Sequence, residues 1–471
     1  MAQINTRKAT GPGTIKNIQI FSNTEPKKSV YLTDLIIDSF KYYESLFQDV
    51  IHASVTYIDS GGTIKAKGGG QLTTAVAGLP ITGSEKVNLL FEDQNEEEIK
   101  VTLYVNNVTE IVTDSTKSMV TLSMNSLELF NNDKVRLNRR FDGKISDHIE
   151  KILKGGKGES GDSLETEKDV DIEPTVGEYN KAFTNKKPFY MMNYFSTRAV
   201  PEGGQGNSAG FLLWETSEGF HFKSIDKLFG QKEKKSIIFN ETPGNPPKGY
   251  DIKALTFDKQ NRNNIKSKLE QGTYATRIIT FDPFTLNYEV SYLNAGNKKQ
   301  SGPKQKGNED TLNKGGEELP KLSGDIKSAK GGQNDFSRTT FQLLDTGSIP
   351  QGKTKSGVDQ SDDRTGGNEQ VEKKEDKNAK PGETLNQSIM RLNQMNTMKI
   401  SMTLPGDFTL HAGDAVKVDS PQLSAARQSR KRQKVDDQTG GLYIIRDLCH
   451  YMTKDVTYTK VNVVRDSFGK K

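Results

Sequence analysis

The sequence predicts a mainly β fold of the α+β type, and three observations support this. Apolar and polar residues alternate from Ile99 to Val105, which is the pattern of a half-buried strand. The same period of two runs from Met398 to Leu404. Glycine and asparagine clusters such as Gly68-Gly69-Gly70 separate the apolar runs, as expected for turns between strands.

The region from Ile15 to Ser126 predicts a β barrel or sandwich. It follows an extended tail, Met1–Thr14, in which Gly11-Pro12-Gly13 interrupts regular structure. The strand candidates, in order, are Ile15–Phe21, Tyr31–Phe40, Val50–Ile58, Lys86–Phe91, Ile99–Val112 and Met119–Met124.

After residue 140 the period changes from two to that of a helix. Ile145, Ile149, Ile152 and Leu153 share one face of a predicted helix, with Asp142 as its expected cap. A second ordered region spans Pro188–Phe229, and Phe211–Trp214 with Glu218–Phe222 predicts a hairpin. Trp214, the only tryptophan, is expected to lie in a core.

The stretch from Asn297 to Pro381 has the most biased composition. It is rich in Lys, Gly, Glu, Asp, Ser and Asn, so most of it cannot bury enough apolar surface to offset the entropy of ordering. We expect long polar loops at Lys298–Lys330 and Gly352–Lys380. Strand candidates nearby are Lys235–Phe239, Ile252–Phe257, Tyr274–Tyr292 and the apolar segment Phe336–Leu344.

The last part of the chain, Gly382–Val464, predicts a helix followed by strands. Leu385, Ile389 and Leu392 share one helix face. Pro405-Gly406-Asp407 ends the strand at Met398–Leu404 and is expected to lead into a returning strand. The remaining strand candidates are Phe408–Val418, interrupted by Ala412-Gly413-Asp414, then Leu442–Met452 and Val456–Val464.

Composition limits the class of protein. The 471 residues carry a net charge of +5 from 66 basic and 61 acidic residues, which argues against a dedicated nucleic-acid binder. The single cysteine, Cys449, permits no internal disulfide and fits a reducing compartment. The N-terminus has no apolar signal segment, and no apolar run reaches the length of a membrane span, so we expect a soluble protein.

No motif predicts a catalytic, cofactor or metal site. A phosphate-binding loop and a zinc-protease helix motif are both missing from the sequence. His148-Ile149-Glu150 matches half of a zinc-deaminase signature, but the required cysteine pair is absent, and we expect a surface histidine. Cys449 and His450 are neighbours in a predicted strand, so they point to opposite faces, and Cys449 is expected in the core. Asp359–Gln370 lacks the central Gly and closing Glu of a calcium loop.

One charge cluster is a candidate interface with a partner. It lies in the loop Ser420–Gly441, between two predicted strands, and could contact an acidic protein surface rather than DNA. The alternative is a solvated loop, partly neutralised by Asp436-Asp437. The cluster consists of Arg427, Arg430, Lys431, Arg432 and Lys434.

The order of these features resembles the baseplate central hub protein of contractile-tailed phages of the T-even type. The C-terminal match is the helix Leu385–Met395, then Met402–Leu410 with Gly413-Asp414, then Tyr443–His450. The N-terminal match is Tyr42–Phe47 between two strands, and Arg139-Arg140-Phe141-Asp142 before the helix. The segments Lys298–Lys380 and Ser420–Gly441 are longer than the family pattern.

The resemblance implies a non-enzymatic structural protein of the virion, without cofactor or metal. It implies two tail-tube-like β-barrel domains, each with a packed helix, plus inserted α+β domains and long polar loops. The expected boundaries are 1–14 for a tail, 15–140 for the first barrel, 141–230 and 261–381 for the insertion, and 231–260 with 382–471 for the second barrel.

The resemblance also implies a location and partners. Such a hub is a homotrimer on the tail axis of the baseplate, assembled in the host cytoplasm, that adapts a sixfold tail tube to a threefold cell-puncturing spike. Implied partners are the trimeric spike, tail-tube or tube-initiator proteins, baseplate wedge proteins and the tape-measure protein. Neither a membrane span nor specific nucleic-acid binding is implied.

Two alternatives remain open at the level of sequence. One is a tail-associated hydrolase, which needs a catalytic carboxylate in a cleft. The other is a peripheral receptor-binding or capsid-decoration protein, which is distinguished from a hub by its position in the particle.

Overall fold

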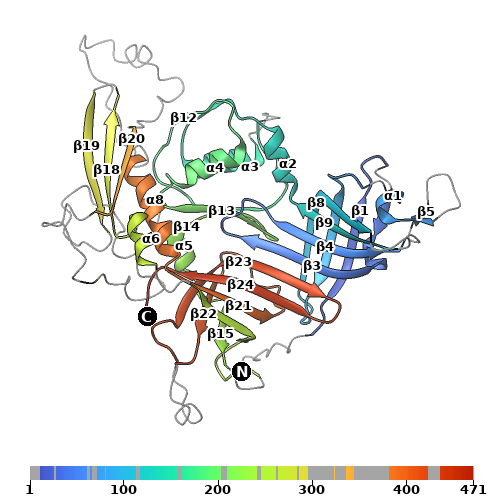
Figure 1. Cartoon of the computed structure of the whole chain (residues 1–471). Coiled ribbons are helices and arrows are strands. Elements are labelled where there is room, and N and C mark those ends of the chain that lie inside the picture. The colour runs from blue at the N-terminus through green and yellow to red at the C-terminus, as the bar shows by residue number, and fades with distance from the viewer. Residues whose placement is uncertain are drawn as a thin grey trace.

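Figure 1 shows the fold of the chain as a computed structural model. The prediction of a mainly β protein is confirmed. One sheet of 14 strands extends through two parts of the chain, and helices gather beside it in the inserted segments (Figure 1). The structure describes residues 11–25, 28–60, 64–65, 72–79, 81–112, 117–155, 162–202, 209–240, 245–260, 264–283, 286–294, 323, 336–343, 381–422 and 435–469.

The first part of the sheet is formed by what we call the N-terminal module. Its six main strands lie in the spatial order β3-β4-β9-β8-β7-β1. The short elements β2 (Ser29–Tyr31), η1 (Leu32–Asp34), β5 (Ile64–Lys65), β6 (Leu72–Thr73) and α1 (Ala75–Gly78) lie between them in sequence. The main strands are β1 (Thr14–Phe21), β3 (Ile36–Ser45), β4 (His52–Asp59), β7 (Lys86–Glu92), β8 (Glu98–Val112) and β9 (Ser118–Asn125).

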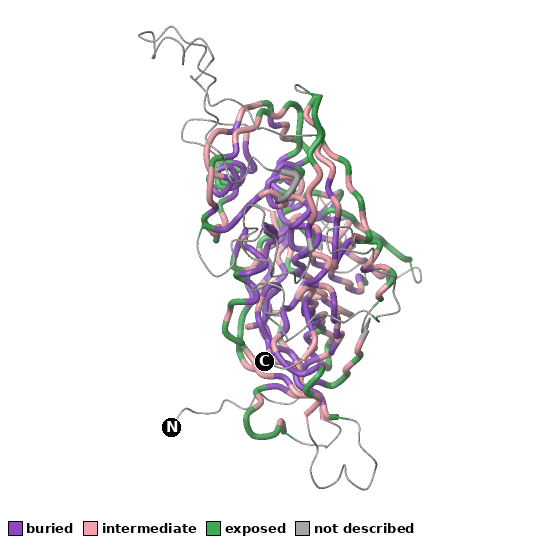
Figure 2. The backbone as a smooth tube through the Cα atoms, turned by 90° about the vertical axis from the view of Figure 1, so that its left-hand side faces the viewer, coloured by how far each residue is buried: buried purple, intermediate pink, exposed green. Residues whose placement is uncertain are grey.

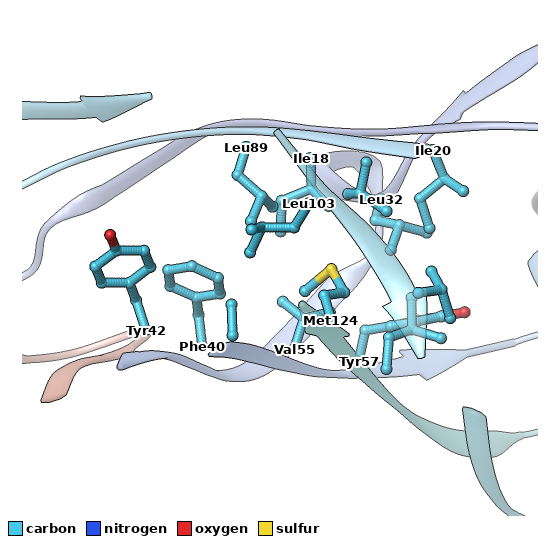
Figure 3. Close-up of a cluster of buried hydrophobic side chains, with 14 of the residues drawn as sticks. Ile18, Ile20, Leu32, Phe40, Tyr42, Val55, Tyr57, Leu89, Leu103 and Met124 are labelled. Carbon is cyan, nitrogen blue, oxygen red and sulfur yellow. The ribbon is translucent and has the colours of Figure 1, made fainter. Parts of the chain in front are cut away.

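The core of the N-terminal module lies between two layers of these strands. Ile18, Leu89 and Leu103 face Phe40 and Val55 across the gap (Figure 3). All five side chains are buried, because alternate residues of each strand point into this core. The predicted strands at 15–21, 86–91, 99–112 and 119–124 are therefore confirmed, while the predicted strand from Tyr31 divides into β2, η1 and β3.

The second part of the sheet is the C-terminal module. Its six main strands lie in the order β17-β21-β24-β23-β22-β15, and β16 (Ile252–Ala254) extends the sheet beyond β15. The strands are β15 (Lys235–Phe239), β17 (Thr256–Gln260), β21 (Met398–Pro405), β22 (Ala415–Asp419), β23 (Gly441–Thr453) and β24 (Thr457–Arg465). A separate core, which includes Ile237, Met402, Leu448 and Val463, fills this module.

One predicted hairpin of the C-terminal module is wrong. The chain after Pro405 does not return as a strand beside β21, since β21 pairs with β17 and β24. Residues Phe408–Asp414 are irregular, because the Asp407 carboxylate accepts the backbone N–H of Thr409 and the Asp414 carboxylate accepts that of His411. Only Ala415–Asp419 is a strand there, and it pairs with β15 and β23.

The first inserted segment lies between the two modules in sequence and has its own core. Its helices are α2 (Leu127–Lys134), α3 (Ile145–Lys154), α4 (Pro188–Ser196) and α5 (Ile225–Phe229), and its strands are β10 (Arg140–Phe141), β11 (Val170–Ile172), β12 (Lys181–Ala182), β13 (Phe211–Thr216) and β14 (Gly219–Ser224). The hairpin and the helix face predicted here are confirmed. Asp142 does not cap α3: Lys144 takes the cap position and the Asp142 carboxylate pairs with Arg140.

The second inserted segment separates β17 from β21. Its described elements are α6 (Ile265–Glu270), β18 (Ala275–Asp282), β19 (Asn287–Asn294), β20 (Arg338–Leu343) and α8 (Pro381–Met395). The three strands form a separate sheet in the order β19-β18-β20, against which α8 packs (Figure 1). The predicted loops Lys298–Lys330 and Gly352–Lys380 lie almost wholly outside the described residues. Figure 2 shows that the buried residues gather along the middle of the molecule, with intermediate and exposed residues toward its outer strands and loops.

Candidate functional site

The two modules repeat one strand arrangement. When the main strands of each module are numbered from one to six along the chain, both modules have the spatial order 2-3-6-5-4-1. Four of the five neighbour pairings are antiparallel in both modules; the exception is the edge pair, antiparallel for β1 with β7 and parallel for β15 with β22. A strand of one module therefore has a structural equivalent in the other.

The repeat extends to irregular details. In β8 the register with β9 shifts at Asn106, and in β23 the register with β24 shifts at Arg446. Six residue pairs follow each of these β-bulges. Because a bulge is a specific local deviation from the ladder, its recurrence fixes the alignment of the two modules residue by residue.

The turn before the fourth strand is also repeated. Val105 exchanges backbone hydrogen bonds with Ser84 (2.6 Å) and Glu85 (3.0 Å), and Ile445 does the same with Gly413 (2.8 Å) and Asp414 (2.9 Å). In both turns the acidic side chain accepts the backbone N–H of the residue three positions earlier, at 2.8 Å. Ser84 (φ 66°) and Gly413 (φ 94°) both have positive φ.

Both modules belong to one sheet because β3 pairs with β23. This antiparallel ladder runs from Asp447 opposite Ser45 to Thr453 opposite Ser39. The pairing is intramolecular, yet it joins the edge strand of one module to the fifth strand of the other (Figure 1). We call it the intrachain junction.

A buried charged group lies at the intrachain junction. The Glu44 carboxylate accepts hydrogen bonds from the Tyr42 hydroxyl (2.8 Å), the backbone N–H of Ala412 (3.0 Å) and the backbone N–H of Ser217 (3.0 Å). His411 Nδ1 lies 3.2 Å from the same carboxylate. Glu44 thus contacts the N-terminal module, the C-terminal module and the first insertion at once.

The electrostatics of this group favour an ion pair. Burial acts to raise the pKa of Glu44, but His411 and the Ala412 N–H outweigh it, so the pKa lies below its ordinary value. Burial acts to lower the pKa of His411, and Glu44 outweighs it in the opposite direction. His450 is fully buried nearby, where burial lowers its pKa to about 3 and keeps the imidazole neutral.

A second buried polar group attaches the first insertion to the N-terminal module. Glu215 of β13 accepts hydrogen bonds from the backbone N–H of Ile51 (3.0 Å) and the Ser126 hydroxyl (2.9 Å). Lys168 bridges Glu215 (2.5 Å) and Glu128 (2.7 Å). These buried carboxylates have positioned partners on separate elements, which indicates a structural role.

The sheet face opposite the two cores is polar across the junction. One row of cross-strand neighbours consists of hydroxyl side chains, and the next consists of polar side chains with one aromatic ring. Thr56 and Thr121 hydroxyls are 3.0 Å apart, and Lys41 and Lys460 lie over the Tyr451 ring. The rows are Thr453-Ser39-Thr56-Thr121-Thr109 and Tyr451-Lys41-Ser54-Ser123-Asn107.

The residues singled out from sequence fall in three places. Arg427, Arg430, Lys431, Arg432 and Lys434 lie outside the described residues. Cys449 is half-buried on the polar face rather than in a core, and burial raises the pKa of its thiol to about 11. His450 points to the opposite face and donates to or accepts from the Thr459 hydroxyl (3.0 Å), as strand geometry requires.

Two further sequence interpretations can be checked. His148 was expected on the surface, but it is buried against Phe141 and Phe195, with Nε2 2.9 Å from the Tyr179 carbonyl oxygen. Trp214 is buried as expected, and its Nε1 donates to the Ala412 carbonyl at 3.0 Å. Within the described ranges, no group of three or more His, Cys, Asp or Glu residues could hold a metal ion. None of the described helices is long and apolar enough to cross a membrane.

Two similar domains were expected only from the family resemblance, and sequence reasoning missed the repeated bulge, the repeated turn and the junction between the modules. The equivalent turns read Thr82-Gly83-Ser84-Glu85 and His411-Ala412-Gly413-Asp414, so a shared acidic residue is the only visible signal. Glu44 gave no signal, because its partners His411, Ala412 and Ser217 are distant in sequence.

Comparison with known proteins found similar folds at low identity. A tail protein of Neisseria meningitidis MC58 matches with a TM-score of 0.48 and 8% identity, covering 96% of each chain. A 43 kDa tail protein of prophage MuSo2 from Shewanella oneidensis matches with a TM-score of 0.47 and 8% identity, covering 96% of this chain and 98% of the other. An Escherichia coli component of the type VI secretion system matches with a TM-score of 0.40 and 7% identity, covering 92% and 74%.

No protein-family model and no curated protein matches the chain.

Proposed function

We propose that this chain is a structural, non-enzymatic subunit of a contractile phage tail baseplate, in which three copies form a ring around the tail axis. The observation that carries the proposal is that two equivalent modules join into one sheet through β3 and β23, with a packed face and a polar face. A sheet that repeats a module at each step has the construction of a ring wall.

The symmetry of such a ring explains why the module is duplicated. Three chains with two modules each present six equivalent surfaces, so one face of the ring matches a sixfold tail tube. The inserted segments occur once per chain, so they present three surfaces and match a threefold spike. This combination supports the proposed hub position between tube and spike.

The polar face is suited to the inside of the ring. Hydroxyl and amide side chains such as Thr56, Thr121 and Asn107 can hydrogen-bond to water along the two polar rows of this face. Closure of the sheet would also remove exposed strand edges, which otherwise promote aggregation.

The proposed partners are those of a central hub. They are the trimeric spike, the tail-tube or tube-initiator proteins, the wedge proteins of the baseplate and the tape-measure protein. The basic cluster Arg427–Lys434 falls between β22 and β23 in the sequence, and we propose it as a contact with an adjacent ring. The proposed location is the virion baseplate, after assembly in the host cytoplasm.

The test combines mass and position. Light scattering of the purified chain, alone and with the spike protein, is expected to give about three times the 52.3 kDa chain mass. A tag on the C-terminus is expected to label the tail axis of assembled particles in electron micrographs. A monomer under both conditions, or a peripheral label, overturns the proposal, and lysis of peptidoglycan in a gel would support the hydrolase alternative instead.

A further inference from the structure

The two modules differ at one strand edge. Beyond the bulge at Arg446, β23 leaves β22 and pairs with β3, from Asp447 to Thr453. Beyond the equivalent bulge at Asn106, β8 leaves β7, whose last partner on β8 is Tyr104. In the described part of the chain, no strand pairs with this side of β8 from Asn107 to Val112. We call this segment the open edge.

Side chains at the open edge are exposed where their equivalents are buried. Met452, at the intrachain junction, is 1% exposed, and its equivalent Val112 is 71% exposed. His450 is fully buried, and its equivalent Glu110 is exposed. Ile111, the equivalent of Tyr451, is 61% exposed. An edge with two exposed β-branched residues in succession is a template for another strand.

The strand that would complete this edge is also present in the chain. β17 occupies the place in the C-terminal module that β3 occupies in the N-terminal module. It pairs with β21 on one side, from Thr256 opposite Thr403 to Gln260 opposite Lys399. Among the described elements, none pairs with its other side. The single chain thus contains one junction of β3 with β23, and the two halves of a second junction at separate places.

We propose that β17 of one copy pairs, antiparallel, with the open edge of β8 in a second copy of this chain. The alignment of the modules fixes the register. At the intrachain junction Phe40 lies opposite Met452, so their equivalents Phe257 and Val112 are expected to lie opposite each other. Tyr42 lies opposite His450, so their equivalents Lys259 and Glu110 are expected to form the next pair on the same face. Between them, the observed pair Lys41 and Tyr451 corresponds to an expected pair of Asp258 and Ile111. We call this contact the interchain junction.

The chemistry of the pairs supports this register. Lys259 meets the acidic Glu110, and the half-buried ring of Phe257 meets the exposed Val112 side chain. Opposite charges and aromatic–aliphatic neighbours across strands each stabilise an antiparallel pair. A shift by one residue would place Phe257 opposite Ile111, on the wrong face of the sheet. The Asp258–Ile111 pair adds no complementarity.

This inference rests on the proposed ring and specifies how its subunits join. Two junctions of the same geometry would alternate around the sheet: one within each chain and one between neighbouring chains. The second copy is favoured over an unrelated partner because the missing strand and its register already exist in this chain.

The test is cysteine crosslinking in a Cys449→Ser background. The interchain pair is Ile111→Cys with Asp258→Cys, on the polar face. The matched control is Tyr451→Cys with Lys41→Cys, which are the equivalent positions at the intrachain junction. A second control combines Glu110→Cys with Asp258→Cys, whose side chains would point to opposite faces.

Under mild oxidation, the interchain pair is expected to give dimers and trimers on a non-reducing gel. The matched control is expected to lose its two thiols without a change of mass, and the opposite-face control is expected to stay largely uncrosslinked. Crosslinking that is equal for the interchain pair and the opposite-face control overturns the register.

Failure of this inference is distinguishable from failure of the ring. If light scattering shows the trimer and the intrachain control crosslinks, but the interchain pair does not, the ring stands and the strand pairing is rejected. If every variant and the unsubstituted chain remain monomers, even with the spike protein present, both are rejected.

Discussion

The N-terminal and C-terminal modules share a sheet but differ in what interrupts it. Between its second and third main strands, the N-terminal module needs only Leu46–Ile51 to connect β3 with β4. At the equivalent place, between β17 and β21, the C-terminal module contains the whole second insertion, with α6, β18–β20 and α8. The sheet is the same on either side, which shows that this connection tolerates a large addition while strand order and register remain fixed.

The modules also differ in how complete their edges are. The C-terminal module has β23 covered on both sides, whereas the described strands cover β8 of the N-terminal module along only part of its length. Equivalent backbone positions can therefore differ in burial. Met452 and Val112 are equivalent, and Met452 is buried because β3 lies beside it.

The largest expected effect is the difference in stability loss between two equivalent aromatic residues. Phe40 is fully buried against Phe91, with ring centroids 4.7 Å apart, while its equivalent Phe257 is half-buried against Phe239. Phe40→Ala should lower the free energy of unfolding by about 4 kcal/mol. Phe257→Ala should cost only about 1–2 kcal/mol in the isolated chain, because its ring is partly in water.

Urea unfolding of both variants measures this difference. Trimer mass by light scattering gives the second readout: Phe257→Ala should weaken association more than its cost to folding suggests. Equal losses of stability for the two variants would contradict the view that one edge is complete and the other open.

The next effect concerns the ion pair at the intrachain junction. Glu44→Gln removes a buried charge and leaves His411 without its carboxylate, which should cost about 3 kcal/mol. Asp38→Asn, an exposed acid on the same strand, is the control and should change stability by at most about 0.5 kcal/mol.

The pH dependence of this cost has a defined sign. The pKa of Glu44 lies below its ordinary 4.5, so its contribution is present above pH 4.5 and is lost as pH falls through the lowered pKa. The pKa of His411 lies above its ordinary 6.5, so its contribution is present below pH 6.5 and is lost as pH rises through the raised pKa. The difference between wild type and Glu44→Gln should therefore be greatest between pH 4.5 and 6.5. A cost that is constant from pH 4 to 9 would argue against an ion pair.

Local patterns in the sequence predicted strands well and predicted pairing poorly. Alternation located β8 and β21, since a half-buried strand leaves its period in the sequence. It failed for Phe408–His411, where Asp407 and Asp414 bind the backbone and replace the ladder, whereas Ala415–Val418 lies in β22. The junctions could not be predicted, because register between β3 and β23 depends on residues about 400 positions apart, and the equivalent turns of the two modules share little sequence.

A smaller effect tests the repeated turn. Gly413 has φ 94°, and a Cβ there would lie 2.7 Å from the Trp214 ring, so Gly413→Ala should cost about 2 kcal/mol in the free energy of unfolding. Its equivalent Ser84 has φ 66° and already tolerates a side chain, so Ser84→Ala should cost less than 1 kcal/mol. Thermal unfolding of the two variants compares them directly. A larger loss for Ser84→Ala would show that the turns are not equivalent in energy.

The smallest effect distinguishes the two junctions by charge. Glu110→Lys places a like charge opposite Lys259 at the proposed interchain junction, and should weaken trimer formation about two- to fivefold at low salt. The effect should shrink as salt screens the pair. Glu97→Lys makes the same charge change at an exposed position of the β7–β8 turn and should leave association unchanged. Adding Lys259→Glu to Glu110→Lys should recover part of the loss, although Lys259 also binds Asp436 at 3.0 Å and Thr439 at 2.8 Å. The proposal places no second chain at the intrachain junction, so reversing the charge of Lys41 there should leave trimer mass unchanged. A change of trimer mass would mean that the intrachain junction also contacts a neighbouring chain.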